Sequence, residues 1–356
     1  MEEVVVAGGG PAGLAAAVRA RQRGFRAVLF ERQAGKPDKA CGEGLMPSGV
    51  LELERLGVRI PEERCTPFRG IRYLQEDGTV LSARFRAGCG LGIRRTELAE
   101  ALRDKALASG ASLRPGAVLA ARPRGDLIEL ETTAGGLEAR LLIAADGLHS
   151  PLRRAAGLYL PAGDAPPRFG VRRHFELTPW TDFVEVYWAE DMEAYVTPVG
   201  PRTVNVALLR DREANEDFPT LLERFPTLRD RLAGAPGTSG IRGAGPLLQR
   251  VRRVWAERLA LVGDAAGYID AITGQGLSLG FAASGLLMDS LPADLSTDLR
   301  PALRVFASRL RPRWLAYALP AQALVALSRR PALRKAAFRT LARVPGAFGA
   351  LVNAVG

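Results

Sequence analysis

The chain has 356 residues, of which 47% are hydrophobic and 24% are charged, and its formal net charge is +11. This length gives room for a large core and about two domains, and this composition is that of a soluble globular protein. Only two histidines are present, and the three cysteines have no metal-ligand spacing, which argues against a metal centre and against a Ser-His-Asp triad.

The beginning of the chain does not resemble an export signal. Glu2 and Glu3 stand where such a signal carries basic residues, and a glycine-rich turn follows the first apolar run. Cys41, Cys65 and Cys89 form no disulfide framework, which fits a reducing compartment. We therefore expect a cytoplasmic protein.

A G-x-G-x-x-G sequence lies between an apolar run at residues 4–7 and a helical pattern that ends near Phe25. In a strand-turn-helix context, the first glycine allows the tight turn, the second lets the backbone approach a pyrophosphate, and the third lets helix and strand pack closely. The motif therefore predicts a Rossmann-type dinucleotide site. Its expected cofactor-binding residues are Gly8, Gly10, Pro11, Ala12 and Gly13.

An acidic residue closes the second predicted strand. Glu31, followed by Arg32, stands 18 residues after Gly13, where a carboxylate accepts hydrogen bonds from a ribose hydroxyl. A carboxylate at this point repels a 2′-phosphate, while the dipole of the preceding helix favours a pyrophosphate. The site thus suits FAD or NAD and not NADP.

Residues 33–46 predict a loop that contains Cys41. Ligands bind at the carboxyl ends of parallel strands, so Cys41 is interpreted either as a thiol beside the cofactor or as a small buried hydrophobe. Beyond the loop we expect a helix over residues 47–57, a hairpin over residues 69–86 and a helix that opens at Arg95.

Two further motifs follow strands. Residues 137–145 predict a strand that leads to Asp146 and Gly147, a pair that on its own indicates only a turn. A strand over residues 259–262 ends at Asp264, whose carboxylate could accept hydrogen bonds from sugar or ribityl hydroxyls. The free amides of the next helix N-terminus can receive an anion. That turn contains Gly274, Gln275, Gly276 and Leu277.

Between these motifs, residues 168–210 change to short β-branched and aromatic runs, which predict an antiparallel sheet. Tyr195 in this sheet is interpreted either as a wall of a substrate pocket or as plain sheet core. The whole pattern predicts an α/β fold: a discontinuous Rossmann-type FAD-binding domain, an antiparallel β-sheet substrate domain and a helical C-terminal segment. The boundaries we expect are 1–68, 90–165 and 246–290 for the first, 69–89 and 166–245 for the second, and 291–356 for the third.

Together, the three motifs resemble the FAD-dependent monooxygenase superfamily, which has the fold of aromatic hydroxylases, and within it the geranylgeranyl reductase family. The resemblance covers residues 1 to about 290 and depends, for the family, on residues 39–45 and 273–276. It implies that Glu31 binds the adenosine ribose and that Arg95 lies beside the FAD. It also implies that Asp146 and Gly147 form the family's Asp-Gly motif, that Asp264 contacts the ribityl and pyrophosphate region, and that residues 274–277 lie against the pyrimidine end of the isoalloxazine.

The implied activity is the reduction of prenyl-type double bonds in a lipophilic small molecule by non-covalent FAD, with NAD(P)H or another electron donor bound transiently. Gly267 and Ala271 stand where aromatic hydroxylases usually have histidine and proline, and the halogenase tryptophans are absent near residues 195–198. An NAD(P)H- and O2-dependent hydroxylase and a flavin-binding electron relay remain alternatives. Cys41 and Tyr195 are the candidate catalytic residues.

The C-terminal segment is strongly basic: from residue 291 onward, 11 basic residues stand against two acidic ones, a charge of +9. Its apolar stretch at residues 315–328 is too short to span a bilayer. Aromatic residues among these arginines indicate either an interfacial amphipathic helix on an anionic membrane or a helical cap over the substrate sheet. No nucleic-acid motif is present, so no nucleic-acid partner is expected. The residues expected to be solvated in either case are Arg329, Arg330, Arg334 and Lys335.

Overall fold

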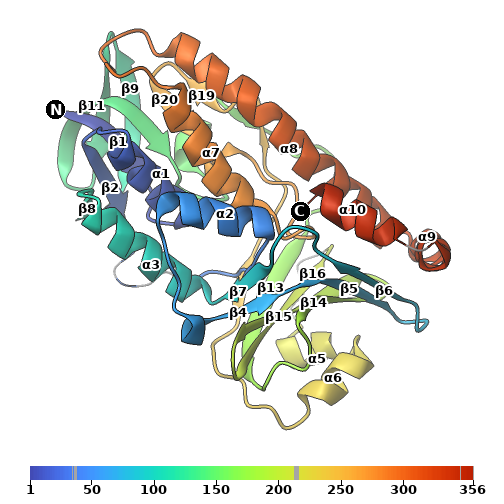
Figure 1. Cartoon of the computed structure of the whole chain (residues 1–356). Coiled ribbons are helices and arrows are strands. Elements are labelled where there is room, and N and C mark those ends of the chain that lie inside the picture. Colours follow the sequence, from blue (N-terminus) through green and yellow to red (C-terminus); the bar gives the residue numbers. More distant parts are fainter. Residues whose placement is uncertain (34, 36–37, 212–215, 345, 356) are drawn as a thin grey trace.

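A computed structural model describes residues 1–33, 35, 38–211, 216–344 and 346–355. Figure 1 shows two sheets, one covered by long helices and the other by a pair of short ones, with the C-terminal helices running along both. Residues 34, 36 and 37 of the expected loop lie outside the described residues.

The first sheet is built on β1 (Glu2–Ala7), whose β-branched residues Val4–Val6 are fully buried. β1 pairs in parallel with β2 and β11, and the strand order is β19-β20-β11-β1-β2-β8, with the β9–β10 hairpin added to β11. The other strands are β2 (Ala27–Glu31), β8 (Ser112–Pro115), β9 (Val118–Arg124), β10 (Leu127–Thr132), β11 (Gly135–Ala144), β19 (Trp255–Ala256) and β20 (Leu259–Leu261).

Helices bury one face of this sheet. Small residues let α1 and α7 approach closely, since a β-carbon added to Gly280 would lie 3.3 Å from Cβ of Ala12. α2 begins with Pro47 and ends at Gly57, whose φ of 68° suits a helix C-terminus. The helices of this part are α1 (Pro11–Gln22), α2 (Pro47–Leu56), α3 (Arg95–Ala108), α4 (Pro151–Ala155) and α7 (Gly276–Ser290), with short 3₁₀ turns η1 (Glu62–Arg64) and η2 (Gly263–Ala266).

The second sheet has the order β17-β13-β16-β15-β14-β5-β6 and is antiparallel except where β14 runs parallel to β5. The predicted hairpin therefore joins this sheet and not the first one. Short helices α5 (Phe218–Leu222) and α6 (Pro226–Leu232) cover one face. The strands are β5 (Gly70–Gln75), β6 (Val80–Arg84), β13 (Phe169–Glu176), β14 (Phe183–Trp188), β15 (Met192–Gly200), β16 (Thr203–Arg210) and β17 (Arg242–Ala244).

Two small sheets link the larger ones. One has the order β3-β7-β4 and begins directly after the Cys41 loop, and the other pairs β12 with β18. Their strands are β3 (Gly44–Leu45), β4 (Cys65–Phe68), β7 (Gly90–Ile93), β12 (Tyr159–Leu160) and β18 (Arg250–Val251).

The C-terminal helices α8 (Arg300–Ser328), α9 (Pro331–Arg343) and α10 (Ala347–Val355) cap the other face of the second sheet. Tyr317, Phe338 and Phe348 are buried there, and the two phenylalanine rings contact Tyr73. These aromatic side chains are therefore core residues and do not face a membrane. Within the described ranges, no helix combines the length and the hydropathy that a membrane-spanning segment needs.

One expectation about the tail is wrong. Arg334 is fully buried, with its guanidinium 5.3 Å from the centroid of the Trp188 ring and its Nε donating to Gln75. Arg329 binds Asp211 at 2.7 Å. Arg334 is buried because α9, which carries it, is docked on the sheet, whereas Arg329 lies just after α8 and is exposed but paired.

Candidate active site

The glycine turn after β1 shows which glycines the fold itself requires. A β-carbon on Gly13 would lie 1.9 Å from the Gly8 carbonyl oxygen, and one on Gly8, whose φ is +107°, would lie 2.4 Å from the Ala145 carbonyl oxygen. A β-carbon on Gly10 would meet only Nη2 of Arg95, at 3.7 Å. Gly8 and Gly13 are therefore needed for packing, while Gly10 faces open space beside a guanidinium.

Two helix N-termini are left without a side-chain cap. α1 follows Gly10, has Pro11 at its first position and carries no acidic residue in its first turn. α7 follows Gln275, again without a side-chain cap. Such ends present free amides and a positive partial charge, so both would stabilise an anionic group.

Glu31 lies against the glycine turn. Its Oε2 accepts a hydrogen bond from the amide of Gly9 at 2.6 Å, and its Oε1 accepts one from the amide of Gln33 at 2.8 Å. A carboxylate has about four lone-pair sites, so acceptor capacity remains for ribose hydroxyls. The adjacent Arg32 is exposed.

Asp264 lies in a recess of the protein. Its side chain is accessible to solvent, yet burial by surrounding protein raises its pKa, while the charges of Arg95, Lys39 and Arg153 lower it. Lys39 shows the same combination: it is exposed, and its pKa is lowered first by burial and then by Arg95. Arg95, Lys39 and Arg153 are therefore all near enough to Asp264 to act electrostatically on its carboxylate. Sequence reasoning had not singled out Lys39 as a cofactor ligand.

The Asp-Gly motif is shaped by its own hydrogen bonds. Asp146 accepts from the Ser150 hydroxyl at 2.6 Å and from the amide of Leu152 at 3.1 Å, so its carboxylate supports the start of α4. Arg153, fully buried, donates to the backbone carbonyl oxygens of Asp264 and Ala265. These bonds tie the second motif to the third.

The Cys41 loop is held by side chains of β13 and β16. Arg172 pairs with Asp38, before Cys41 in the loop, and Nδ2 of Asn205 donates to the Cys41 carbonyl oxygen at 2.9 Å. His174 Nε2 lies 2.5 Å from Oε2 of Glu43, after Cys41 in the loop. Because β13 and β16 are paired strands, the second sheet clamps the loop on both sides of the thiol.

The hydrogen bonds assign the tautomer of His174. Its Nδ1 lies 3.1 Å from Nη1 of Arg172 and 2.9 Å from Oγ of Ser239. Arginine only donates, so Nδ1 is the acceptor and Nε2 carries the proton that His174 donates to Glu43. Oε1 of Glu43 accepts from the amide of Arg95 at 2.8 Å. This buried chain escaped the sequence analysis, because 131 residues separate its two central members.

Both candidate catalytic side chains are electrically neutral. Burial raises the pKa of Cys41, whose Sγ accepts a hydrogen bond from the amide of Glu43 at 3.4 Å. Burial also raises the pKa of Tyr195 well above its ordinary value, and the hydroxyl donates to the Ile272 carbonyl oxygen at 3.2 Å. Cys41 is therefore a protonated thiol at neutral pH, and Tyr195 is a donor fixed to the Ile272 carbonyl within a buried aromatic cluster.

Substituting Cys41 by serine separates the two interpretations of this residue. The change in volume is small, so we expect the melting temperature and the bound FAD to stay close to those of the parent. If the thiol is a proton donor, turnover per bound flavin should fall by about a hundredfold, the usual contribution of a general acid. Normal turnover in a variant that loses FAD or melts early would make the thiol structural.

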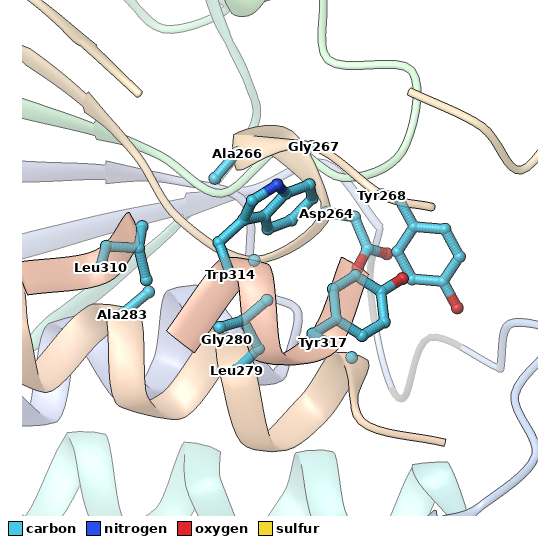
Figure 2. Close-up of a pocket in the computed structure, with 12 residues that line it drawn as sticks. Asp264, Ala266, Gly267, Tyr268, Leu279, Gly280, Ala283, Leu310, Trp314 and Tyr317 are labelled. Atoms are coloured by element: carbon cyan, nitrogen blue, oxygen red, sulfur yellow. The ribbon is translucent and has the colours of Figure 1, made fainter. Parts of the chain in front are cut away.

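A narrow hollow lies behind Asp264, between η2, α7 and α8 (Figure 2). Trp314 and Tyr317 of α8 reach into it beside Gly267 and Tyr268. A β-carbon on Gly267, whose φ is +115°, would lie 3.0 Å from the Trp314 ring. The indole therefore leaves no room for the histidine that aromatic hydroxylases usually carry at this position.

These features together fit FAD. The open space at Gly10, the two uncapped helices and the cations around Asp264 suit a pyrophosphate and a flavin. Oγ1 of Thr273 and Oδ1 of Asn205 are buried and have no hydrogen-bond partner among the described residues, as expected where a bound group completes the site. Fold and site define an FAD-dependent oxidoreductase.

The chain belongs to the family whose model is described as "FAD binding domain", which matches residues 1–298. The FAD-binding superfamily inferred from the motifs is thereby confirmed. The segment from α8 onward lies beyond the matched residues.

The curated relatives include reductases and a hydroxylase. The chain is 27% identical over 335 residues to a menaquinone reductase of Mycolicibacterium smegmatis, covering 84% of this chain and 78% of the relative. It is 29% identical to digeranylgeranylglycerophospholipid reductase 2 of Methanothermobacter thermautotrophicus, covering 88% and 83%. It is 28% identical to the 3-demethoxyubiquinol 3-hydroxylase of Escherichia coli, covering 81% and 79%.

Solved structures share the fold. The flavin-dependent brominase Bmp2 superposes with a TM-score of 0.80 at 16% identity, covering 96% of this chain and 93% of the brominase. The flavin-dependent halogenase CmlS superposes with a TM-score of 0.79 at 22% identity, covering 88% of this chain and 62% of the halogenase. The expected α/β FAD-binding fold, the antiparallel sheet domain and the C-terminal helices are confirmed.

Proposed function

We propose that this oxidoreductase reduces a carbon–carbon double bond in a lipophilic prenyl-bearing molecule, either a prenylated quinone or a prenyl lipid. The observation that carries the proposal is the position of the Cys41 loop: a protonated thiol is clamped next to the recess that suits FAD. The names of the menaquinone and digeranylgeranylglycerophospholipid reductases support the substrate class.

FAD would be held at Gly10, Arg95, Asp264 and residues 274–277, and when bound and reduced it supplies a hydride. Saturating a double bond also needs a proton on the second carbon. The thiol of Cys41 supplies this proton and recovers it from solvent after turnover. Tyr195 and Asn205, both on the same face of the second sheet, orient the substrate and exclude water.

Product mass tests this proposal. The enzyme is supplied with NAD(P)H or dithionite and, in separate assays, with a menaquinone or an unsaturated prenyl lipid, without oxygen. We expect a product heavier by two hydrogen atoms that fragmentation places in the prenyl chain, a gain that persists after the quinone ring is reoxidised. Mass spectrometry of lipids that co-purify with the protein identifies which of the two substrates to use first. No reduced product from either class would contradict the proposal.

Hydroxylation is the second candidate, because the 3-demethoxyubiquinol 3-hydroxylase is also a relative. It predicts oxygen uptake in proportion to a product heavier by one oxygen atom. The contact between Gly267 and Trp314 argues against it, since the usual histidine has no room. An electron relay without its own substrate predicts no turnover with any donor.

Because the proposed substrates are lipophilic, the proposed function also includes binding of the protein to an anionic membrane surface. Leu315 and Leu319 lie one helical turn apart on α8 and are 41% and 61% exposed. Exposed arginines precede them on the same helix, as in interfacial amphipathic helices. We expect the protein to bind anionic vesicles, and binding to weaken in high salt because exposed charges are screened.

Charge reversal of exposed arginines in α8 tests this contact without disturbing the buried Arg334. Each basic residue near an anionic surface contributes about 1 kcal/mol, so vesicle binding should fall by at least about tenfold. The reversed residues are Arg304, Arg309, Arg311 and Arg313. The control is an equal charge change at exposed arginines outside the tail, namely Arg122, Arg250, Arg252 and Arg253. Equal vesicle binding by the two folded variants would end the membrane hypothesis.

A further inference from the structure

The loop between η2 and α7, residues 267–275, is held by a side chain from outside the family-matched part of the chain. Oη of Tyr317, in α8, accepts hydrogen bonds from the amides of Ile269 and Asp270, both at 3.1 Å. The same hydroxyl donates to the carbonyl oxygen of Asp270 at 2.9 Å. Tyr317 is only 2% exposed, so water cannot readily take over these bonds.

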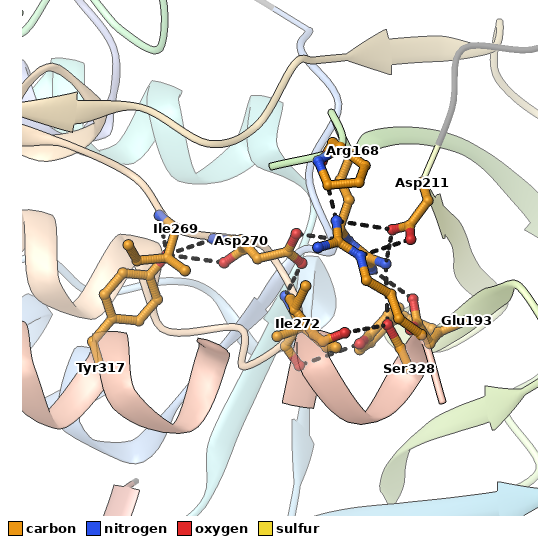
Figure 3. Close-up of polar contacts among 12 residues, drawn as sticks. Arg168, Glu193, Asp211, Ile269, Asp270, Ile272, Tyr317 and Ser328 are labelled. Carbon is orange, nitrogen blue, oxygen red and sulfur yellow. Dashed lines mark hydrogen bonds and ion pairs between the residues drawn. The ribbon is translucent and has the colours of Figure 1, made fainter. Parts of the chain in front are cut away.

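A buried arginine ties the same loop to the second sheet and to the end of α8 (Figure 3). Arg168 donates through Nε to Asp270 at 2.8 Å and through Nη2 to Glu193 of β15 at 2.7 Å. Its Nη1 donates to Ser328, the last residue of α8, at 3.3 Å. Oδ1 of Asp270 then accepts from the amide of Ile272 at 3.0 Å, which fixes the shape of the loop.

These contacts determine where the N-terminus of α7 points. The loop joins η2, which carries Asp264, to the start of α7 at Gly276, and the ring of Trp314 packs against its first residue, Gly267. α8 therefore contacts the loop at its beginning through Trp314 and at its centre through Tyr317, while Arg168 bridges the loop to the far end of α8. The N-terminus of α7 has no side-chain cap hydrogen bond of its own.

We propose that α8 is a component of the cofactor site, in which Tyr317 and Arg168 are positioning residues that hold loop 267–275 so that the amides at the start of α7 face the flavin. This inference rests on the placement of FAD against residues 274–277 and is independent of the substrate. A reduced flavin is anionic, so a correctly placed helix N-terminus stabilises it more than the oxidised form. Loosening the loop therefore weakens FAD binding and makes the flavin harder to reduce.

The test compares Tyr317→Phe with Tyr73→Phe. Both remove a buried hydroxyl from the aromatic core under the C-terminal helices, but Tyr73 packs on Phe338 and Trp188. For Tyr317→Phe we expect the Kd for FAD to rise about tenfold. We expect the midpoint potential to fall by about 30 mV, which corresponds to a tenfold larger loss of affinity for the reduced than for the oxidised flavin. Tyr73→Phe should change neither quantity.

Thermal unfolding of the apoproteins separates positioning from general stability. The proposal is wrong if the FAD affinity and midpoint potential of Tyr317→Phe match those of the parent, and earlier melting than Tyr73→Phe would then give Tyr317 a purely structural role. If Tyr317→Phe yields too little folded protein, Arg168→Lys takes its place, because lysine keeps the buried charge but loses the several hydrogen bonds of the guanidinium. The Kd for FAD and the midpoint potential are then measured for this variant. All readouts use FAD without substrate, so failure of the proposed reaction leaves this test intact. A parent protein that binds no FAD would instead refute the cofactor site itself.

Discussion

Replacing Gly10 by valine should give a folded but colourless protein. The β-carbon enters open space, with only Nη2 of Arg95 nearby at 3.7 Å, and the φ of Gly10, −72°, is one that any residue adopts. The added side chain would occupy the path of the pyrophosphate, so FAD binding should fall by several orders of magnitude while the apoprotein keeps its melting temperature. The flavin absorbance of the purified protein and its circular dichroism measure both effects.

Gly13→Ala provides the contrasting control. Its methyl group would lie 1.9 Å from the Gly8 carbonyl oxygen, so this variant should lose folding together with FAD. A yellow Gly10→Val protein with a normal FAD content would show that the pyrophosphate does not lie at this turn.

Glu43→Ala should be among the most destabilising single changes in the site. It leaves Nε2–H of His174 and the amide of Arg95 without their buried acceptor. Each orphaned donor costs about 1–3 kcal/mol, so we expect the free energy of unfolding to fall by about 3 kcal/mol. Chemical denaturation of the apoprotein measures the loss.

The matched control is Glu54→Ala, an exposed glutamate on α2 that should change stability by about 0.5 kcal/mol or less. Glu43→Gln should lie between the two, because its amide oxygen still accepts one hydrogen bond. If Glu43→Ala is as stable as Glu54→Ala, the clamp on the Cys41 loop contributes nothing to the fold.

Local sequence patterns were sufficient to predict the fold class and the glycine turn after the first strand. The β-branched run at residues 4–6, the proline at the start of α1 and the acid at Glu31 each act over short distances, so their spacing predicts strand, turn and helix directly. The hairpin at residues 69–86 was also predicted. Its place with residues 166–245 was expected too, but its parallel pairing with β14 was not, because that pairing depends on contacts between distant segments.

The parts that sequence reasoning missed all depend on such distant contacts. No local signal links Glu43 to His174 or Tyr317 to Ile269, because each pair is joined only when the second sheet and α8 pack on the first domain. The same packing buries Arg334. From the sequence, its place in a basic segment had predicted a solvated side chain. The composition gives the net charge of the tail, but it does not show which of the charged side chains are buried in the folded protein.

Gly267 is a case in which a departure from a family pattern has a structural reason. The glycine in place of the hydroxylase histidine was noted from the sequence, and the structure places Trp314 within 3.0 Å of any β-carbon there. Trp314→Ala would open this space. The reductase proposal thus depends on a residue in α8, outside the part of the chain that the family model matches.

The most direct test of the central proposal is a single turnover without oxygen. The FAD-loaded enzyme is reduced, freed of excess reductant and mixed with a prenylated quinone or an unsaturated prenyl lipid. The reductase proposal predicts that the yellow absorbance returns in the absence of oxygen and that the product contains two additional hydrogen atoms in its prenyl chain, which remain after any quinol formed is reoxidised to the quinone. Absorbance that returns only when oxygen is admitted, together with an oxygen atom in the product, would contradict it.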